Sequence, residues 1–411
     1  MNYEASVRYL LSLGSELAAP TQAATAKFDL ENISVLAERL GRPDRTYPSA
    51  HIAGTNGKGS TAAFLESILR HAGFRTGLNT SPHLEKINER IRVAGEQISD
   101  EDFAGVLTRI QSLTEELLAA GKLRAHPTYF ECVTALAFEY FAQHRVKFAI
   151  FEVGLGGRLD ATNIVTPVVS IITRIDFDHE NFLGHSLQEI AAEKAGILKS
   201  AVPVILADQR PEAREVVLAR AATLHCPAIE IASAYQIDQE SMPAACIRAR
   251  VTETTSGWSI DLAPRLPGRF QLQNALNAVA AARLLSERGF RISDQDIAEG
   301  IADTVWPGRI EKLQSHPDVY LDGAHNPSAA RELATFWQEH FAHRKIYLLY
   351  GALRDKAVRE RLDGLSPGAE DQDLLFQQLR ACSHRFRDAL LELFFDERSG
   401  LSKMTKTYGV F

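Results

Sequence analysis

The sequence predicts an α/β protein with two domains, a large domain built on a parallel β-sheet followed by a smaller α/β domain. Short apolar runs bounded by turn residues alternate with longer helical patterns, which is typical of a parallel sheet covered by helices. The chain has 411 residues, which is too long for one ordinary core. Its hydrophobic content of 45% and charged content of 24% match a globular protein.

In the large domain, four short apolar runs are predicted strands and two longer segments carry apolar residues at helical spacing. The strands are expected at residues 50–53, 148–153, 168–173 and 204–207, and the helices at 60–71 and 129–143. Residues 1–19 are expected to form an amphipathic helix, because charged residues interrupt the apolar run that a secretory signal needs.

The rhythm changes in the second half of the chain. Two β-rich runs within residues 247–262 flank the turn 254–257 and predict a hairpin. A helical stretch at 274–287 precedes Trp306-Pro307-Gly308, which suits a connection between domains. We expect domains at residues 1–298 and 299–411, the second Rossmann-like. Its expected elements are strands at 319–321 and 346–350 and a helix at 327–341.

Composition excludes several classes of function. The net charge is −7, from 45 basic and 52 acidic residues, so no overall basic field attracts a nucleic acid. The four cysteines are far apart and form no CxxC pair, which suits a reducing cytosol. No segment reaches the roughly 18 consecutive apolar residues of a membrane span. We expect a cytoplasmic protein without nucleic-acid or membrane partners.

The segment after the first expected strand has the features of a phosphate-binding P-loop. Glycines at 54, 57 and 59 allow several backbone N–H groups to point toward an anion at a helix start. Lys58 adds a positive charge, and Ser60 and Thr61 supply hydroxyls for a phosphate oxygen or a metal. The loop departs from G-x-x-x-x-G-K-[ST], since the residue after the lysine is Gly59.

The run Gly54-Thr55-Asn56-Gly57-Lys58-Gly59-Ser60-Thr61 resembles the phosphate loop of the Mur ligase superfamily, and within it that of the folylpolyglutamate synthase/dihydrofolate synthase family. The resemblance implies a P-loop ATPase domain in which these eight residues bind ATP. An incidental glycine-rich turn is the alternative.

Three further segments resemble the family's magnesium site. They are 80–84 with Ser81, 151–163 with Glu152 at the end of an apolar strand, and 173–179 with His179. The resemblance implies that Ser81, Glu152 and His179 bind magnesium, which prefers a few carboxylate or hydroxyl oxygens. Taken alone, these residues also fit a Ser-Pro turn, a buried structural glutamate and a surface histidine.

Two segments resemble family regions next to the nucleotide. Residues 193–199 place Lys194 where the family carries a carbamylated lysine, which can bind a second magnesium; a surface Glu-Lys helix pair is the alternative. Residues 268–275 place Asn274 where the family reads adenine, although an asparagine that begins a helix also serves as its cap.

Segments in the second domain match as well. Arg309 would meet the phosphates, while Asp322 and His325 would face the ribose and phosphate region. The resemblance further implies catalytic roles for Lys58, Lys194 and His325. The pairs Asp-Gly and Asn-Pro are also common in turns, so this segment alone would suggest only a loop.

The implied activity is ATP-dependent addition of L-glutamate to a folate or dihydropteroate carboxylate through an acyl phosphate, by a monomer with ATP and two Mg²⁺ ions. The resemblance extends to residue 356, and from about 366 the tail diverges, so the second domain could be incomplete. Alternatives are a Mur-type peptidoglycan precursor ligase, a nucleotide-binding remnant without turnover, and a simple kinase. ATP consumption that ignores glutamate would count against the ligase.

Overall fold

The computed structural model describes residues 1–14, 29–241, 246–342 and 346. The chain divides into two compact units. The first comprises Met1–Ser81 and Ile87–Trp306, and the second comprises Pro82–Lys86 and the described residues from Pro307 onward. The division falls at 306/307 and not at 298/299, because the helix that contains residue 298 packs within the first unit.

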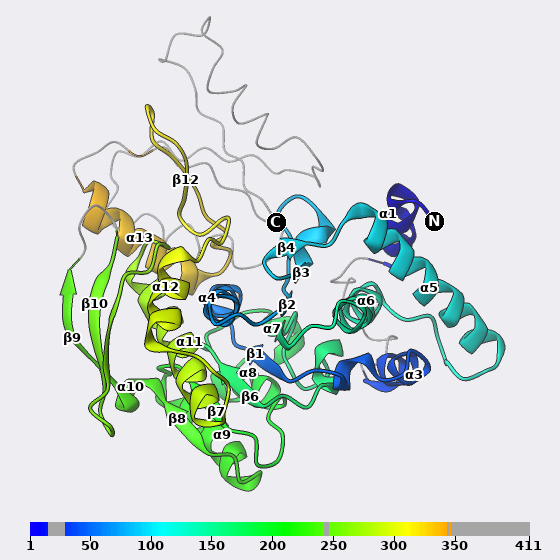
Figure 1. Ribbon diagram of the computed structural model, residues 1–411, viewed down its shortest axis with the longest axis horizontal. Coiled ribbons are helices and arrows are strands. Elements are labelled where there is room, and N and C mark those ends of the chain that lie inside the picture. The colour runs from blue at the N-terminus through cyan, green and yellow to red at the C-terminus, as the bar shows by residue number, and fades with distance from the viewer. Residues whose placement is uncertain (15–28, 242–245, 343–345, 347–411) are drawn as a thin grey trace, which may run out of the picture. The chain divides into compact units, whose positions relative to one another are not determined.

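An eight-stranded sheet lies at the centre of the first unit, in the order β4-β3-β2-β5-β1-β6-β7-β8 (Figure 1). Every neighbouring pair from β2 to β8 is parallel, whereas β3 and β4 add an antiparallel edge. This confirms the predicted fold class. The strands are β1 (Ser49–Ala53), β2 (Thr76–Asn79), β3 (Ile91–Val93), β4 (Glu96–Gln97), β5 (Phe148–Glu152), β6 (Val169–Ile172), β7 (Val204–Leu206) and β8 (Ala228–Glu230).

The four predicted strands are confirmed as β1, β5, β6 and β7, and both predicted helices are present as α4 and α6. The helices of the first unit are α1 (Tyr3–Ser12), α3 (Glu31–Arg39), α4 (Lys58–His71), α5 (Asp100–Ala119), α6 (Tyr129–Gln143), α7 (Glu180–Leu183), α8 (Leu187–Ala195), α9 (Pro211–Thr223), α10 (Ile231–Ala234), α11 (Arg269–Glu287) and α12 (Asp294–Asp303), with short 3-10 turns at Pro43–Arg45, Ile87–Arg90 and Ala161–Ile164. Within the described part of the chain, none of the helices has the length and apolarity needed to cross a bilayer.

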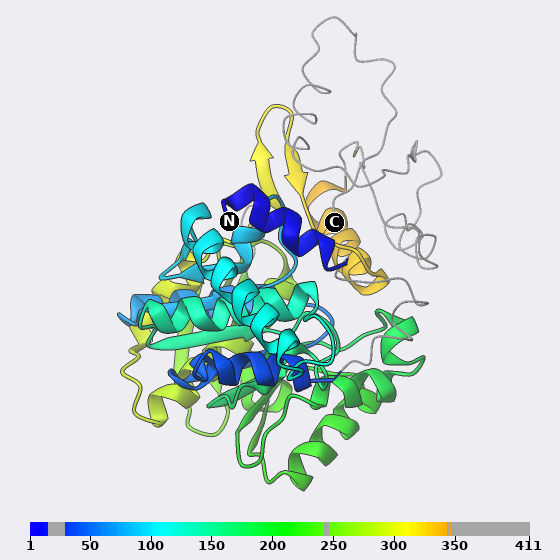
Figure 2. The same ribbon diagram turned by 90° about the vertical axis from the view of Figure 1, so that its right-hand side faces the viewer.

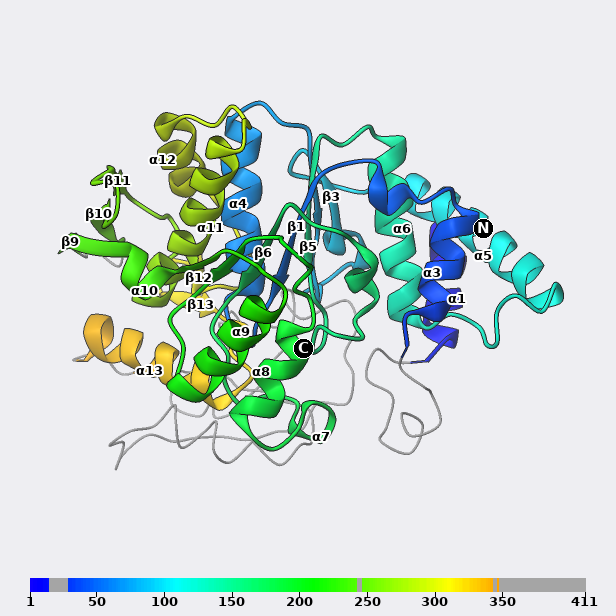
Figure 3. The same cartoon turned by 90° about the horizontal axis from the view of Figure 1, so that it is seen from below.

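The sheet is covered on both faces, which explains why its central strands are buried along their whole length and mostly apolar rather than alternating. Along β5, Phe148 and Ile150 join the core beneath α4, α11 and α12, whereas Ala149 and Phe151 join the core beneath α3, α5 and α6. Figure 3 shows the two helix groups on opposite sides of β1, β5 and β6.

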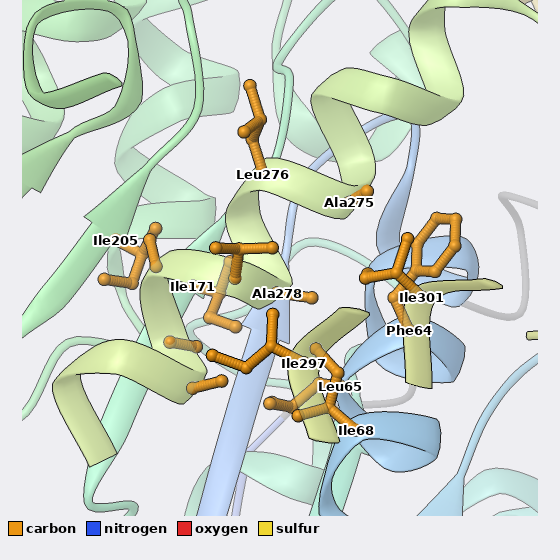
Figure 4. Packing of buried hydrophobic residues seen from close by; sticks show 14 of the residues in the cluster. Phe64, Leu65, Ile68, Ile171, Ile205, Ala275, Leu276, Ala278, Ile297 and Ile301 are labelled. Atoms are coloured by element: carbon orange, nitrogen blue, oxygen red, sulfur yellow. The ribbon is translucent and has the colours of Figure 1, made fainter. Parts of the chain in front are cut away.

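The core on the α4 side contributes most to holding the phosphate loop, because α4 begins in that loop. Phe64 and Ile68 of α4 pack with Ile301 of α12 and Ala278 of α11, all fully buried (Figure 4). Burying an aliphatic or aromatic side chain of this size stabilises the fold by roughly 1.5–3 kcal/mol. This packing fixes the position of α4, so that its N-terminus faces the carboxyl edge of the sheet.

A second, three-stranded sheet in the order β11-β10-β9 contains the predicted hairpin. β10 (Arg248–Glu253) and β11 (Ser259–Leu262) are antiparallel, as the sequence predicts. The third strand, β9 (Tyr235–Ser241), was not predicted. Its alternating polar residues suit a small sheet with one buried face.

The described part of the second unit contains the hairpin of β12 (Glu311–Gln314) and β13 (Val319–Leu321) and the helix α13 (Pro327–Phe341) (Figure 2). The expected strand at 319–321 and helix at 327–341 are confirmed. Asn326 caps α13 by accepting a hydrogen bond from the Ala329 N–H, and Pro327 occupies the first turn. Residues 347–350 of the expected strand at 346–350, and the divergent tail from about 366, lie outside the described residues.

Candidate active site at the carboxyl edge of the sheet

The segments that leave β2, β5, β1 and β6 carry most of the predicted site residues of the first unit. These four strands are neighbours and parallel, so their carboxyl ends lie at one edge of the sheet. Ser81 follows β2, Glu152 ends β5, the glycine-rich loop follows β1, and the segment with His179 follows β6. The carboxyl edge of an open parallel sheet is the usual place for a ligand.

The glycine-rich loop is fastened to the segment that follows β6. The backbone N–H groups of Thr55 and Asn56 both donate to the Arg174 carbonyl, at 2.9 and 3.2 Å. The Thr55 hydroxyl donates to the Asp176 carbonyl at 2.9 Å and accepts from the Asp176 N–H at 3.0 Å. These bonds orient the loop and use the N–H groups of two residues that the resemblance assigns to ATP binding.

Two loop glycines are required by close neighbours. A Cβ at Gly54 would lie 1.9 Å from the Thr173 hydroxyl oxygen, and one at Gly57 would lie 2.1 Å from Oδ1 of Asn274. Gly57 also has φ of 87°, in the left-handed region, where it caps α4. The glycines therefore let the backbone approach both β6 and α11.

Asn274 lies in the second turn of α11, because that helix begins at Arg269 with Gly268 as its N-cap. The expected helix start at residue 274 is wrong, and with it the alternative that Asn274 is a helix cap. Its amide donates to Oε1 of Gln271 at 3.0 Å, and its carbonyl accepts from the Thr61 hydroxyl at 3.3 Å. Asn274 is thus placed beside the loop by long-range packing.

Two lysine ammonium groups converge on one carbonyl of the loop. Lys58 donates to the carbonyl oxygens of Gly54 and Thr55, at 3.0 and 3.1 Å. Lys194 donates to the same Gly54 oxygen at 2.9 Å, and its side chain is 3% exposed. Burial first, and then the charge of Lys58, lower the pKa of Lys194 to about 7. The alternative that Lys194 belongs to a surface Glu-Lys helix pair is therefore wrong, because its side chain is buried.

Glu152 and Ser81 meet at the same edge. The buried Glu152 carboxylate accepts a hydrogen bond from the Ser81 backbone N–H at 3.1 Å. A Cβ at Gly59 would lie 3.5 and 3.6 Å from its two oxygens, so the carboxylate stands beside the first turn of α4. Ser60 is buried within that turn.

His179 takes a left-handed conformation with φ of 48° and precedes α7. Its Nε2 lies 3.8 Å from Oδ1 of Asp178. Among the described residues, no group of three or more His, Cys, Asp or Glu side chains is arranged to hold a metal. Magnesium needs fewer protein ligands, because it keeps waters and binds nucleotide phosphates, so one carboxylate with a neighbouring serine fits it.

Asp160 supports the Glu152 loop, a role that the sequence did not reveal. Its Oδ2 accepts from the N–H groups of Gly154 and Leu155 at 2.9 and 3.0 Å, and its Oδ1 accepts from the Thr162 N–H at 3.0 Å. Burial raises the pKa of this carboxyl, and the hydrogen bonds oppose that rise. A carboxylate eight residues after a strand end, within a glycine-rich run, is the signal that could have indicated it.

In the second unit, Asp322 organises its own loop. Its carboxylate accepts from the N–H groups of Ile310 and Ala324, at 2.9 and 2.8 Å. Burial raises the pKa of Asp322, while the nearby Arg309 lowers it. Arg309 Nη1 donates to the Gly308 carbonyl at 3.0 Å, and His325 Nδ1 lies 2.9 Å from the Gly323 carbonyl. The three predicted residues of this unit therefore belong to one compact loop pair.

Comparison with known proteins agrees with this architecture. Residues 52–282 match the Mur ligase middle domain, and residues 308–376 match the Mur ligase, glutamate ligase domain. The dihydrofolate synthase/folylpolyglutamate synthase of Bacillus subtilis is 40% identical over 339 residues, covering 82% of this chain and 78% of that protein. The folylpolyglutamate synthase of Lacticaseibacillus casei is 34% identical over 367 residues, covering 89% and 83%.

Solved structures agree. An FPGS complex with AMPPCP and folate has a TM-score of 0.84 at 31% identity, covering 97% of this chain and 94% of that chain. Folylpolyglutamate synthase of Mycobacterium tuberculosis, complexed with ADP and AMPPCP, has a TM-score of 0.77 at 31% identity, covering 90% and 81%.

The two-unit fold and the glycine-rich loop at the sheet edge define the class of Mur-type ATP-dependent ligases. Within that class, the chain belongs to the folylpolyglutamate synthase/dihydrofolate synthase family. The predicted resemblance and the predicted class of enzyme are confirmed.

Proposed function

We propose that this protein adds L-glutamate to the carboxylate of a folate, using ATP and an acyl phosphate intermediate. The observation that carries the proposal is the convergence of the glycine-rich loop, two lysines and the Glu152 carboxylate at one sheet edge. Relatives with the same fold have been solved with AMPPCP, ADP and folate, which supports ATP and a folate as the small-molecule ligands. The proposal places the protein in the cytoplasm, because ATP is supplied inside the cell. It also treats the protein as a monomer.

The loop suits a triphosphate because it combines cations with the N-terminus of a fourteen-residue helix. The Lys58 ammonium group donates to two loop carbonyls. It therefore lies at the loop, where a bound phosphate would be its neighbour. In the proposal, residues 54–61 hold the phosphates and Asn274 contacts the base. Arg309, Asp322 and His325 are proposed to contribute to nucleotide binding as well.

Magnesium is assigned to Glu152 and Ser81, with His179 as a further ligand. When bound, the ion would neutralise the phosphate oxygens and orient the terminal phosphoryl group. Glu152 is a good ligand because the Ser81 N–H and the loop held by Asp160 fix its position.

The chain's own contribution to the reaction is positioning and charge. A folate carboxylate attacks the terminal phosphorus of ATP, ADP leaves, and the acyl phosphate forms. The glutamate amine then attacks the acyl carbon and phosphate leaves, with one proton released from the amine. Lys58 and Arg309 offset the charge that develops on the transferred group.

Lys194 is proposed to be carbamylated. With a pKa lowered to about 7, a useful fraction of this buried amine is neutral and able to attack carbon dioxide, forming a carbamate and releasing a proton. The carbamate would replace one of two cations on the Gly54 carbonyl by an anion that can bind a second magnesium. A carbamate signal in the 13C NMR spectrum of the intact protein in 13C-labelled bicarbonate buffer, absent from Lys194→Met, would reveal it.

The proposal is tested by measuring ADP release with magnesium, ATP, glutamate and either tetrahydrofolate or dihydropteroate. We expect release only when both glutamate and one pterin acceptor are present, and the two acceptors separate the synthase activities. Lys58→Ala should lower turnover by about a hundredfold or more. Glutamate-independent ATP consumption would refute the ligase, and nucleotide binding without any product would favour the remnant.

A further inference from the structure

Gly59 stands where the strict phosphate-loop pattern carries serine or threonine directly after the lysine. A Cβ at this position would lie 3.1 Å from the indole Nε1 of Trp306 and 3.5 Å from a Glu152 oxygen. The space that a serine side chain would fill is therefore bounded by an indole N–H and a carboxylate. Glycine at 59 keeps this space open.

The indole is held in place by its surroundings. The Arg92 guanidinium carbon lies 5.2 Å from the Trp306 ring centroid, and the ring packs against the core beneath α4. No described residue accepts a hydrogen bond from Trp306 Nε1. In the other arginine–tryptophan pair of this unit, Arg283 lies 4.4 Å from the Trp258 ring, and the Trp258 N–H donates to Asp294 at 3.0 Å. The Trp306 donor is thus available where the Trp258 donor is not.

Trp306 is also the last residue of the first unit, and the chain enters the second unit at Pro307. We propose that Trp306 is a positioning residue of the nucleotide site: its indole N–H, available in the space beside Gly59 and the Glu152 carboxylate, would donate to a phosphate oxygen or to a water bound to the magnesium and so orient that ion. This inference rests on the proposed function, because it concerns the same magnesium and nucleotide.

Groups that orient a metal ligand without touching the metal typically change metal affinity by 10–100-fold when removed. Trp306→Phe keeps an aromatic ring under Arg92 and removes the N–H. We therefore expect magnesium affinity in the presence of AMPPCP to fall about tenfold, while kcat at saturating magnesium changes much less. Arg92→Met, which leaves the indole unsupported, should weaken magnesium binding about threefold.

The experiment is calorimetric titration of magnesium into the protein with AMPPCP, together with the magnesium dependence of turnover. Trp258→Phe is the matched control, since it removes the same group from the equivalent pair elsewhere in the unit. Equal thermal unfolding midpoints for the two variants would show that both fold.

A weakened magnesium response in Trp306→Phe and Arg92→Met, with Trp258→Phe like the parent, is the expected result. The inference is overturned if Trp306→Phe matches the parent, or if Trp258→Phe is weakened equally. If the parent protein binds no nucleotide, both the proposed function and the positioning role are wrong. A parent that turns over normally while Trp306→Phe is unchanged overturns the positioning role alone.

Discussion

The nucleotide edge of the first unit and the loop pair 308–326 of the second unit are built in different ways. At the first edge, Gly57 is packed against Asn274, and Lys194 donates to the Gly54 carbonyl. The partners of the glycine-rich loop therefore come from distant parts of the chain. In the second, Asp322 binds the N–H groups of Ile310 and Ala324, and all partners lie within one short segment. The first arrangement depends on the whole fold, whereas the second is largely self-contained.

The largest expected effect comes from disturbing the close packing of the glycine-rich loop against α11 at the first edge. Gly57→Ala places a Cβ 2.1 Å from Oδ1 of Asn274 at a residue with φ of 87°. The loop or α11 must move, and a displacement of about 1 Å in a catalytic site can lower turnover about a hundredfold. Steady-state ADP release with saturating substrates measures the loss.

Gly73→Ala is the control for backbone strain. Gly73 has φ of 82°, nearly that of Gly57, but a Cβ there meets no atom within 4 Å. It should cost about 1–2 kcal/mol of stability and leave turnover unchanged. If both variants lose activity equally, backbone strain and not the approach to Asn274 explains the glycine.

The second prediction tests whether the second-unit loop is self-contained. Asp322→Asn replaces one acceptor oxygen by an N–H₂ group, so either the Ile310 or the Ala324 N–H loses its acceptor. Leaving a donor of this kind unsatisfied costs about 1–3 kcal/mol. Hydrogen exchange of residues 308–326 should accelerate accordingly, while exchange in α4 stays unchanged.

Asp318→Asn is its control within the same unit, since it removes the exposed ion pair between Asp318 and Lys312 at 2.6 Å. Such pairs contribute roughly 0–1 kcal/mol. Accelerated exchange of α4 in Asp322→Asn would show that the loop pair is coupled to the first unit after all.

The third prediction concerns the pH dependence that Lys194 imposes. Its pKa is about 7 in the folded chain and 10.5 as an ordinary lysine, so between these values the unfolded chain binds one more proton. Stability relative to Lys194→Met should therefore rise with pH from about 7 upward, by at most about 1.4 kcal/mol per pH unit. Urea unfolding in carbon dioxide-free buffer at several pH values measures it, and a flat difference would mean that Lys194 stays charged.

Sequence patterns predicted the parts of the molecule whose signals are local. The strands β1, β5, β6 and β7 each contain a run of mostly apolar residues flanked by turn residues, so each was found. β2 was missed because its ends are polar. Thr76 and Asn79 are buried only because they donate to Glu66 and to the Arg90 carbonyl, which no short window of sequence reveals.

The candidate site divides in the same way. The glycine-rich loop and Glu152 at a strand end carry recognisable patterns, and both lie at the expected edge. The supporting residues carry none. Residue 274 was the predicted helix start, although that helix begins at Arg269, and Asp160 and Trp306 were recognised only as parts of a motif and a connection.

The smallest expected effect tests whether backbone hydrogen bonds or a side-chain ion pair hold the first edge together. Arg158 donates its backbone N–H to the Glu193 carbonyl at 2.9 Å, and its guanidinium forms an ion pair with the Glu193 carboxylate at 2.8 Å. The guanidinium is 56% exposed, so Arg158→Gln should cost less than about 1 kcal/mol. Because the backbone bond remains and Lys194 keeps its place beside Gly54, nucleotide affinity measured by calorimetry should not change. A clear loss of affinity would mean that the surface ion pair, and not the buried backbone contacts, aligns the Glu152 loop with α8.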